Sequence, residues 1–289
     1  MRNEIDARTS IGTVQLRVSQ LQRSIDFYRS VVGLRLLGQE RNGAELGVPG
    51  SNRPLLKLVE IPDAIPRLRR SGAGLYHVAL LVPDRRSLGL ALRSLIRSGV
   101  RIGQSDHLVS EALYISDPDN NGIEIYRDRP RQEWHWDANG HVRMAVDPID
   151  RDGLLAEAGD APWNGLPEGT TVGHIHLHVT ELPTTEHFYV DVLGFNLVAG
   201  MADSAMFISA GGYHHHIGLN VWAGIGAPLT PEHAPGLDYY EIAVPDTAAQ
   251  MAVFARLQAA SVPLRTDRGT VIVSDPSGIQ IHIVVREPA

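Results

Sequence analysis

The sequence contains no cysteine among its 289 residues. This absence excludes disulfides, cysteine-ligated zinc, iron–sulfur clusters and thiol nucleophiles. The sequence also lacks any apolar run close to the roughly 20 residues that span a bilayer. The first ten residues, MRNEIDARTS, lack the apolar core of a signal peptide. We therefore expect a cytoplasmic protein that has no membrane partner.

Positively charged residues are fewer than negatively charged ones. The chain has 26 Lys and Arg and 33 Asp and Glu, which gives a net charge of −7. A protein that binds the phosphate backbone of nucleic acid usually presents an excess of positive charge, so nucleic acid is not an expected partner. Histidine, in contrast, occurs 13 times, against five Phe and four Trp. Imidazole is the commonest metal ligand and carries protons near neutral pH, so we look for the chemistry among the histidines.

Four segments of the chain share one layout. The first has an alternating strand pattern at 11–18, a helical pattern at 19–34 and three short strand patterns that end at residue 60. The third repeats its FYxxVxG motif, and the second and fourth begin with LYHVALLVPD and LDYYEIAVPD. Period-two alternation predicts strands, and apolar residues three and four apart predict helices. Each segment therefore predicts a βαβββ unit, and the fold class is α+β.

The length predicts about two domains, and the repeats divide the chain at a segment with little periodicity. We predict an N-terminal pair of units in 9–130, a linker over 131–171 and a C-terminal pair in 172–289. The four units span 9–62, 72–130, 172–224 and 236–289. Within the linker we expect a short helix at 151–158, and we expect Trp134, Trp136 and Trp163 to pack the linker onto the body.

The repeats carry FYxxVxG after the first helix and DPxxNxIE on a last strand, and this arrangement resembles the vicinal oxygen chelate superfamily of glyoxalases, bleomycin-resistance proteins and extradiol dioxygenases. The runs DHLVSEALYISDPDNNGIEIYRDRP, GHIHLHV and GGYHHHIGLNVWAG look like the bacterial catechol 2,3-dioxygenases of the four-unit type. The resemblance implies four units paired into two curved mixed sheets. It also implies that Fe(II) and O₂ open a catechol or substituted catechol to 2-hydroxymuconic semialdehyde, and we expect a homo-oligomer.

A ferrous site for oxygen chemistry needs two neutral imidazoles and one carboxylate, with open positions for substrate and O₂. In the family, metal ligands lie near the start of each first strand and in the middle of each last strand. The matching positions on the first strands hold Thr13, His77, His174 and Tyr239. On the last strands of units two and four they hold Glu124 and His282.

These ligand types decide which units share a sheet. Pairing unit one with two leaves only one histidine, and pairing three with four provides no carboxylate. Pairing two with three provides His77, Glu124 and His174, which is the complete triad. We therefore predict that these three residues hold Fe(II), for which Mn(II) could substitute. We expect no metal in the sheet of units one and four, where His282 has a structural role.

Opening a catechol ring also requires groups that move protons near the metal. A catalytic histidine of the family corresponds here to His215, with His216 as the alternative. If His215 faces inward, strand alternation predicts that its neighbours His214 and His216 face away. A pocket tyrosine ten residues before the glutamate ligand corresponds to Tyr114.

Two more histidines are candidates for the same site. His107 matches, with a shift of about two residues, a second histidine of the family before the pocket tyrosine. His176 shares a strand face with His174, because residues two apart point the same way, so we expect it to line the substrate pocket.

Two alternatives are weighed against the catechol dioxygenase. One is a hydroquinone dioxygenase or a glyoxalase-type isomerase, whose metal site tends to contain an additional Glu or Gln where unit three offers His174. The other is a non-enzymatic drug-binding protein of the bleomycin-resistance kind. Such a protein needs no metal, so a full ligand triad beside candidate acid–base residues argues against it.

Overall fold

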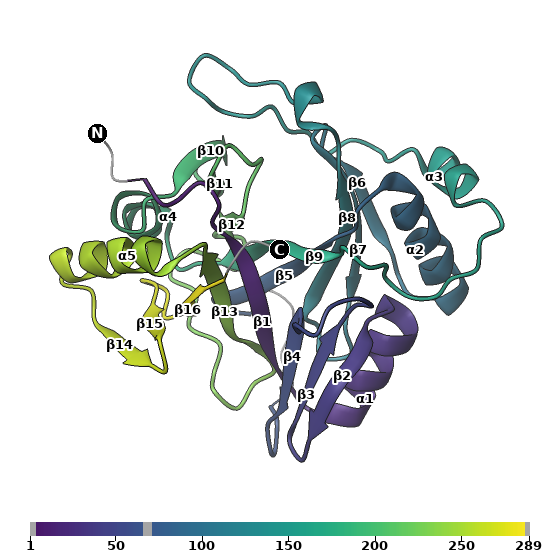
Figure 1. Cartoon of the computed structure of the whole chain (residues 1–289), viewed down its shortest axis with the longest axis horizontal. Coiled ribbons are helices and arrows are strands. Elements are labelled where there is room, and N and C mark those ends of the chain that lie inside the picture. The colour runs from purple at the N-terminus through teal and green to yellow at the C-terminus, as the bar shows by residue number, and fades with distance from the viewer. Residues whose placement is uncertain (1–3, 66–70, 287–289) are drawn as a thin grey trace.

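Two sheets of eight strands form the body of the protein in the computed structural model, which describes residues 4–65 and 71–286 (Figure 1). Unit one contains β1 (Ser10–Val18), α1 (Leu21–Phe27), β2 (Arg35–Glu40), β3 (Gly43–Gly47) and β4 (Leu56–Glu60). Unit two contains β5 (Gly74–Leu81), α2 (Arg85–Ser98), β6 (Gly103–Asp106), β7 (Ser110–Ser116) and β8 (Gly122–Asp128).

The second half of the chain repeats this order after a linker that contains α3 (Arg151–Ala158). Unit three contains β9 (Thr171–His178), α4 (Leu182–Glu186), β10 (Asn196–Met201), β11 (Ala205–Ser209) and β12 (Ile217–Asn220). Unit four contains β13 (Gly236–Val244), α5 (Thr247–Ala259), β14 (Leu264–Asp267), β15 (Thr270–Ser274) and β16 (Gln280–Val285). The predicted α+β class is confirmed, and residues 287–289 of the predicted fourth unit lie outside the described residues.

Each sheet combines one unit from either half of the chain. The strand orders are β14-β15-β16-β13-β1-β4-β3-β2 and β10-β11-β12-β9-β5-β8-β7-β6. The first and last strands of each unit run parallel, and the two units of a sheet join through an antiparallel pair, β1 with β13 or β5 with β9. Units two and three therefore share a sheet, as the distribution of metal-ligand types favoured. The division of the chain into two halves at 131–171 stays a prediction.

Consecutive units also contact each other, through a buried tyrosine on one and a buried turn aspartate on the next. The Tyr28 hydroxyl donates to Asp117 Oδ2 at 3.0 Å, and the Tyr189 hydroxyl donates to Asp275 Oδ2 at 3.1 Å. Burial raises the pKa of each aspartate to about 6. The two FYxxVxG motifs thus supply the tyrosines that fix unit one to unit two and unit three to unit four.

The predicted helix over 19–34 is shorter and less regular than expected. It begins at Leu21 and continues as a π-helical turn over Tyr28–Val32, which ends at Gly33 with a φ of 89°. A side chain at Gly33 would lie 2.5 Å from the Trp163 ring, so the linker packs closely on this turn. The α2 helix is better delimited, because the Asp84 side chain caps its first turn.

The linker packs on unit two on the side of the helix α2. The predicted helix over 151–158 is confirmed as α3, and it packs on α2, to which it lies adjacent in Figure 1. Trp134 is buried and Trp163 packs against the main core, as expected. The expectation for Trp136 was wrong, because 40 % of this residue is exposed. No helix within residues 4–65 and 71–286 has the length and apolarity to cross a bilayer.

Candidate metal centre

Three side chains converge where units two and three meet. His77 lies on β5, Glu124 on β8 and His174 on β9. Their ligand atoms all lie within 4.8 Å of one another, and all three residues are buried. Glu124 Oε2 lies 2.9 Å from His77 Nε2 and 3.0 Å from His174 Nε2. The structure thus brings together the three ligand candidates, two from unit two and one from unit three.

The strand register explains this convergence. Ala79 of β5 is paired with Glu124 on one side and with His174 on the other, so the three strands align the carboxylate with the imidazole. His77 is two residues before Ala79 and points to the same face. It pairs with Gly122, where a Cβ atom would collide with the Tyr76 carbonyl. The glycine therefore permits the close approach of β8 to β5.

The protonation states of the cluster suit a cation. Burial alone would raise the pKa of Glu124, but the nearby imidazoles of His174 and His77 outweigh it and hold that pKa well below its usual value. Burial lowers the pKa of His174 even though Glu124 opposes this shift. An ionised carboxylate and a neutral imidazole are the forms that bind a metal.

An orphaned buried atom supports the same conclusion. His77 Nε2 is buried and makes no well-aligned hydrogen bond within residues 4–65 and 71–286, although it lies 2.9 Å from Glu124 Oε2. Two imidazole nitrogens thus lie against one carboxylate oxygen, and only that of His174 forms a hydrogen bond with it. Two histidines and one carboxylate are also the donor set of non-heme Fe(II) sites. The residues present therefore fit a divalent transition metal.

Tyr114 and His107 lie together beside the metal-ligand cluster. His107 Nε2 and the Tyr114 hydroxyl are 2.6 Å apart, and His107 Nδ1 is 2.7 Å from the Ala145 carbonyl of the linker. Tyr114 is paired with Glu124 across β7 and β8. Burial, with the Glu124 charge, raises the pKa of Tyr114 well above its usual value. The two candidates that matched the family separately are therefore one hydrogen-bonded pair.

The histidine run 214–216 places His215 nearest the cluster. The His215 and His174 ring centroids lie 4.2 Å apart, and burial lowers the pKa of His215 well below its usual value. His216 is turned to the backbone, where its Nδ1 accepts a hydrogen bond from the Ala210 amide at 3.2 Å. The prediction that His214 faces away was wrong, because its Nδ1 lies 2.8 Å from His215 Nδ1. The run lies in an irregular, bent segment before β12, where strand alternation does not apply.

His176 lies in an aromatic cluster on the same face. Its ring centroid is 5.0 Å from that of His77, 5.6 Å from that of Phe207 and 5.3 Å from that of Trp222. The buried His176 Nε2 has no hydrogen-bond partner in the part of the chain that the structure describes. Gly218 on β12 leaves room for this ring, since a Cβ atom there would lie 2.8 Å from His176 Cγ. Phe207 and Trp222 were not predicted from the sequence, although Trp222 lies in the run GGYHHHIGLNVWAG.

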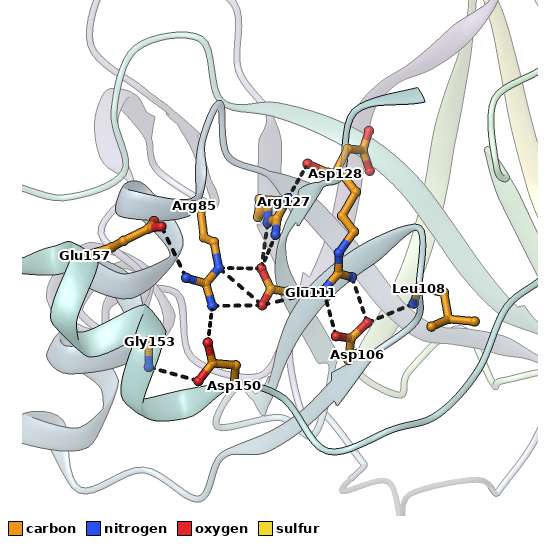
Figure 2. Close-up of polar contacts among 10 residues, drawn as sticks. Arg85, Asp106, Leu108, Glu111, Arg127, Asp128, Asp150, Gly153 and Glu157 are labelled. Carbon is orange, nitrogen blue, oxygen red and sulfur yellow. Dashed lines mark hydrogen bonds and ion pairs between the residues drawn. The ribbon is translucent and has the colours of Figure 1, made fainter. Parts of the chain in front are cut away.

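A buried charge network supports the hairpin that carries His107 and Tyr114 (Figure 2). The Glu111 carboxylate accepts hydrogen bonds from Arg85 at 2.9 Å and from Arg127 at 2.7 Å. Arg129 binds both oxygens of Asp106, the residue before His107, at 2.7 Å. Arg85 also contacts Asp150 and Glu157 at the linker helix α3. The network thus joins β7, β8, α2 and the linker behind the site.

The other sheet arranges its matching positions differently. Tyr239 and His282 stack face to face with their ring centroids 3.7 Å apart. The Thr13 hydroxyl donates to the Pro54 carbonyl at 2.9 Å. The side chains at these three register positions are thus engaged with each other or with the backbone.

This fold and this site define a class of protein. The chain belongs to the Glyoxalase/Bleomycin resistance protein/Dioxygenase superfamily, whose family model matches residues 10–125. It is 48 % identical over 279 residues to the catechol-2,3-dioxygenase of Bacillus subtilis (strain 168), and the match covers 96 % of this chain and 98 % of that protein.

Solved structures share the fold. A putative dioxygenase from Bacillus subtilis superposes with a TM-score of 0.66 at 17 % identity, covering 99 % of this chain and 87 % of that one. Glyoxalase I from Zea mays superposes with a TM-score of 0.56 at 15 % identity, covering 96 % of this chain and 92 % of that one. At such identities the likeness concerns the fold alone.

Proposed function

We propose that this protein is an Fe(II)-dependent extradiol dioxygenase that opens catechol, or a substituted catechol, to a 2-hydroxymuconic semialdehyde. The enzyme class rests on the near-full-length relationship to a catechol-2,3-dioxygenase. The observation that carries the finer proposal is the set of two imidazoles and one carboxylate whose ligand atoms lie within 4.8 Å of one another. Its cytoplasmic location and its assembly into a homo-oligomer stay predictions from the sequence.

We assign His77, Glu124 and His174 as the residues that would hold Fe(II) or Mn(II). When bound, the metal supplies a Lewis acid that lowers the pKa of a chelated diol and a centre at which O₂ can react. Two protein imidazoles and one carboxylate leave coordination positions for both substrate oxygens. The imidazoles beside Glu124 hold its pKa well below the usual value, and burial lowers the pKa of His174, so the unprotonated forms of both residues are favoured.

His215 is the proposed acid–base residue. Burial keeps its imidazole neutral by lowering its pKa, so it is ready to accept a proton from a substrate hydroxyl. It then returns a proton as the ring opens, which is the exchange that general acid–base catalysis requires. The Tyr114 hydroxyl, held by His107 at 2.6 Å, offers a second hydrogen bond that orients the substrate oxygens.

The aromatic cluster around His176 is the proposed wall for the substrate ring. Phe207 and Trp222 provide flat apolar surfaces, which favour a planar aromatic ligand. The unpartnered Nε2 of His176 is a polar group that a ring substituent or hydroxyl could satisfy. The isomerase alternative has less support, because unit three contributes His174 rather than a second carboxylate to the ligand cluster. The drug-binding alternative has less support, because such a protein needs no cluster of metal-ligand side chains.

The decisive experiment is oxygen uptake on addition of catechol to protein reconstituted with Fe(II) under anaerobic conditions. We expect one O₂ consumed per catechol and a yellow ring-opened product. Uptake with hydroquinone but not with catechol, or iron binding without any uptake, would reject the catechol proposal. Absence of bound iron would instead favour the drug-binding alternative.

Variants test the residue roles. Glu124→Ala and His174→Ala should each abolish stoichiometric iron binding, whereas His187→Ala, at a histidine whose side chain is 68 % exposed, should leave it unchanged. His215→Ala should retain iron and lose turnover by roughly 10²–10⁴-fold, the usual contribution of acid–base catalysis. Retention of iron by Glu124→Ala would refute the ligand assignment, and normal turnover of His215→Ala would transfer its role to His216 or His107.

A further inference from the structure

A chain of three polar side chains leads from the end of β8 to the site. Asp128 is the last residue of β8 and follows Glu124 by four positions, so both point to the same face of the sheet. Asp128 Oδ1 lies 2.8 Å from His214 Nε2, and His214 Nδ1 lies 2.8 Å from His215 Nδ1. His214 is completely buried, whereas the Asp128 side chain is 23 % exposed.

The hydrogen bonds determine where the protons reside. An ionised carboxylate only accepts, so the proton between Asp128 and His214 belongs to His214 Nε2. A neutral imidazole carries one proton, which makes His214 Nδ1 an acceptor. The proton between the two histidines therefore belongs to His215 Nδ1, and His215 Nε2 is left with a free lone pair.

The alternative arrangement is a doubly protonated His214 that donates to both neighbours. It would place a cation at a site with no solvent exposure, where burying charge is costly. A His214 that donates from Nε2 to Asp128 and accepts at Nδ1 from His215 satisfies both contacts without a buried cation.

We propose that Asp128 and His214 are a positioning pair that fixes His215 as the Nδ1-protonated tautomer, with Nε2 as the atom that accepts the substrate proton. The inference rests on the proposed role of His215. It resembles the logic by which a buried carboxylate orients a catalytic imidazole in hydrolases, here with one additional imidazole between the two. The Asp128 carboxylate also accepts a hydrogen bond from the Tyr213 hydroxyl at 3.2 Å, which helps to orient it toward His214.

The first test reads the tautomer directly and needs no turnover. Long-range ¹H–¹⁵N NMR spectra of the full chain loaded with Zn²⁺, a diamagnetic ion, distinguish protonated from unprotonated ring nitrogens. His215→Gln assigns the signals of His215. We expect a protonated Nδ1 and an unprotonated Nε2 on His215 in the wild type. A His215 protonated at Nε2 would overturn the proposal even if the enzyme cleaves catechol.

The second test is kinetic. His214→Phe and Asp128→Leu should each lower kcat with catechol by roughly 10²-fold, the lower part of the acid–base range, and should change KM by less than about threefold. Asp128→Asn retains an oxygen that accepts from His214 Nε2, so it should restore most of the rate. Matched changes at the exposed pair His187 and Asp191, whose atoms lie 3.0 Å apart, should leave kcat unchanged.

A double-mutant cycle separates positioning from a general structural effect. In the His215→Gln background, Asp128→Leu should cause no further loss of kcat, because the group that it positions is absent. A further loss of tenfold or more would reject the proposal, as would a kcat for His214→Phe within threefold of the wild type. If the wild type shows no oxygen uptake, the proposed function fails, and the NMR experiment alone decides the tautomer.

Discussion

Replacing Glu111 by Gln should reveal how far the hairpin behind the site depends on its charge network (Figure 2). Glu111 is 1 % exposed and faces Arg85 and Arg127, whose side chains are 22 % and 13 % exposed. Glutamine has nearly the same shape, but it replaces one acceptor oxygen by an NH₂ group and removes the negative charge. The substitution therefore tests the charge and the hydrogen bonds with little change in packing volume.

The expected loss of unfolding free energy follows from the contacts that Arg85 and Arg127 keep in the variant. Breaking a buried ion pair by removing one partner costs about 3–5 kcal/mol. Arg85 keeps contacts with Asp150 and Glu157, so Arg127 is the cation that loses most, and we expect a cost of roughly 2 kcal/mol, within the range for one charged hydrogen bond. For 289 residues unfolding together, an unfolding entropy of about 0.6 kcal/mol per kelvin converts this to a Tm lower by about 3 °C.

Calorimetry and urea unfolding at one pH and one metal concentration measure this loss. Glu157→Gln is the matched control, because Glu157 contacts the same arginine but its side chain is 47 % exposed; it should cost less than about 0.5 kcal/mol. If Glu111→Gln proved no more destabilising than Glu157→Gln, the network would not carry the stability that its burial implies, and the reasoning would be wrong.

Three further predictions concern the site itself. Tyr114→Phe should lower kcat by about 10-fold or more with iron content unchanged, measured by oxygen uptake and metal analysis. Gly218→Ala should raise KM for catechol by displacing the His176 ring, whereas Gly200→Ala, which has space for a Cβ atom, should not. Burial lowers the pKa of His216 to about 3, so its neutral form contributes stability at neutral pH. That contribution should be lost as the pH falls from about 6.5 toward 3. Chemical unfolding across this range should show that the free energy of unfolding falls less for His216→Asn than for the wild type.

The repeats made much of the fold predictable. Alternation and helical spacing predicted the order of elements in all four units, because each pattern reflects one buried face. The π-helical turn at Tyr28–Val32 recurs at His187–Val192 in the second FYxxVxG motif, but apolar residues three and four apart do not distinguish such a turn from an α-helix. The exposure of Trp136 likewise depends on the path of an irregular linker, for which periodicity gives no information.

The sequence predicted the convergence of His77, Glu124 and His174 better than it predicted the surroundings of these residues. His77, Glu124 and His174 each have a position in a repeat, so register counting could bring them together. Asp128 and His214 have no such position, because their contact joins a strand end to an irregular segment 86 residues further along the chain. Only the three-dimensional arrangement reveals that the histidine run is connected to β8.

The strand pairing explains why the proposed metal ligands are divided between units two and three. β5 pairs in parallel with β8 and antiparallel with β9, so Ala79 on β5 has Glu124 on one side and His174 on the other. Neither half supplies all three ligands, since His77 and Glu124 precede the linker and His174 follows it. In the other sheet the same framework contains Thr13, Tyr239 and His282, and the Tyr239 and His282 rings stack on each other. A duplicated framework thus provides two equivalent seams. Among the described residues, the seam between β5 and β9 is the one that places two imidazoles and a carboxylate at these register positions.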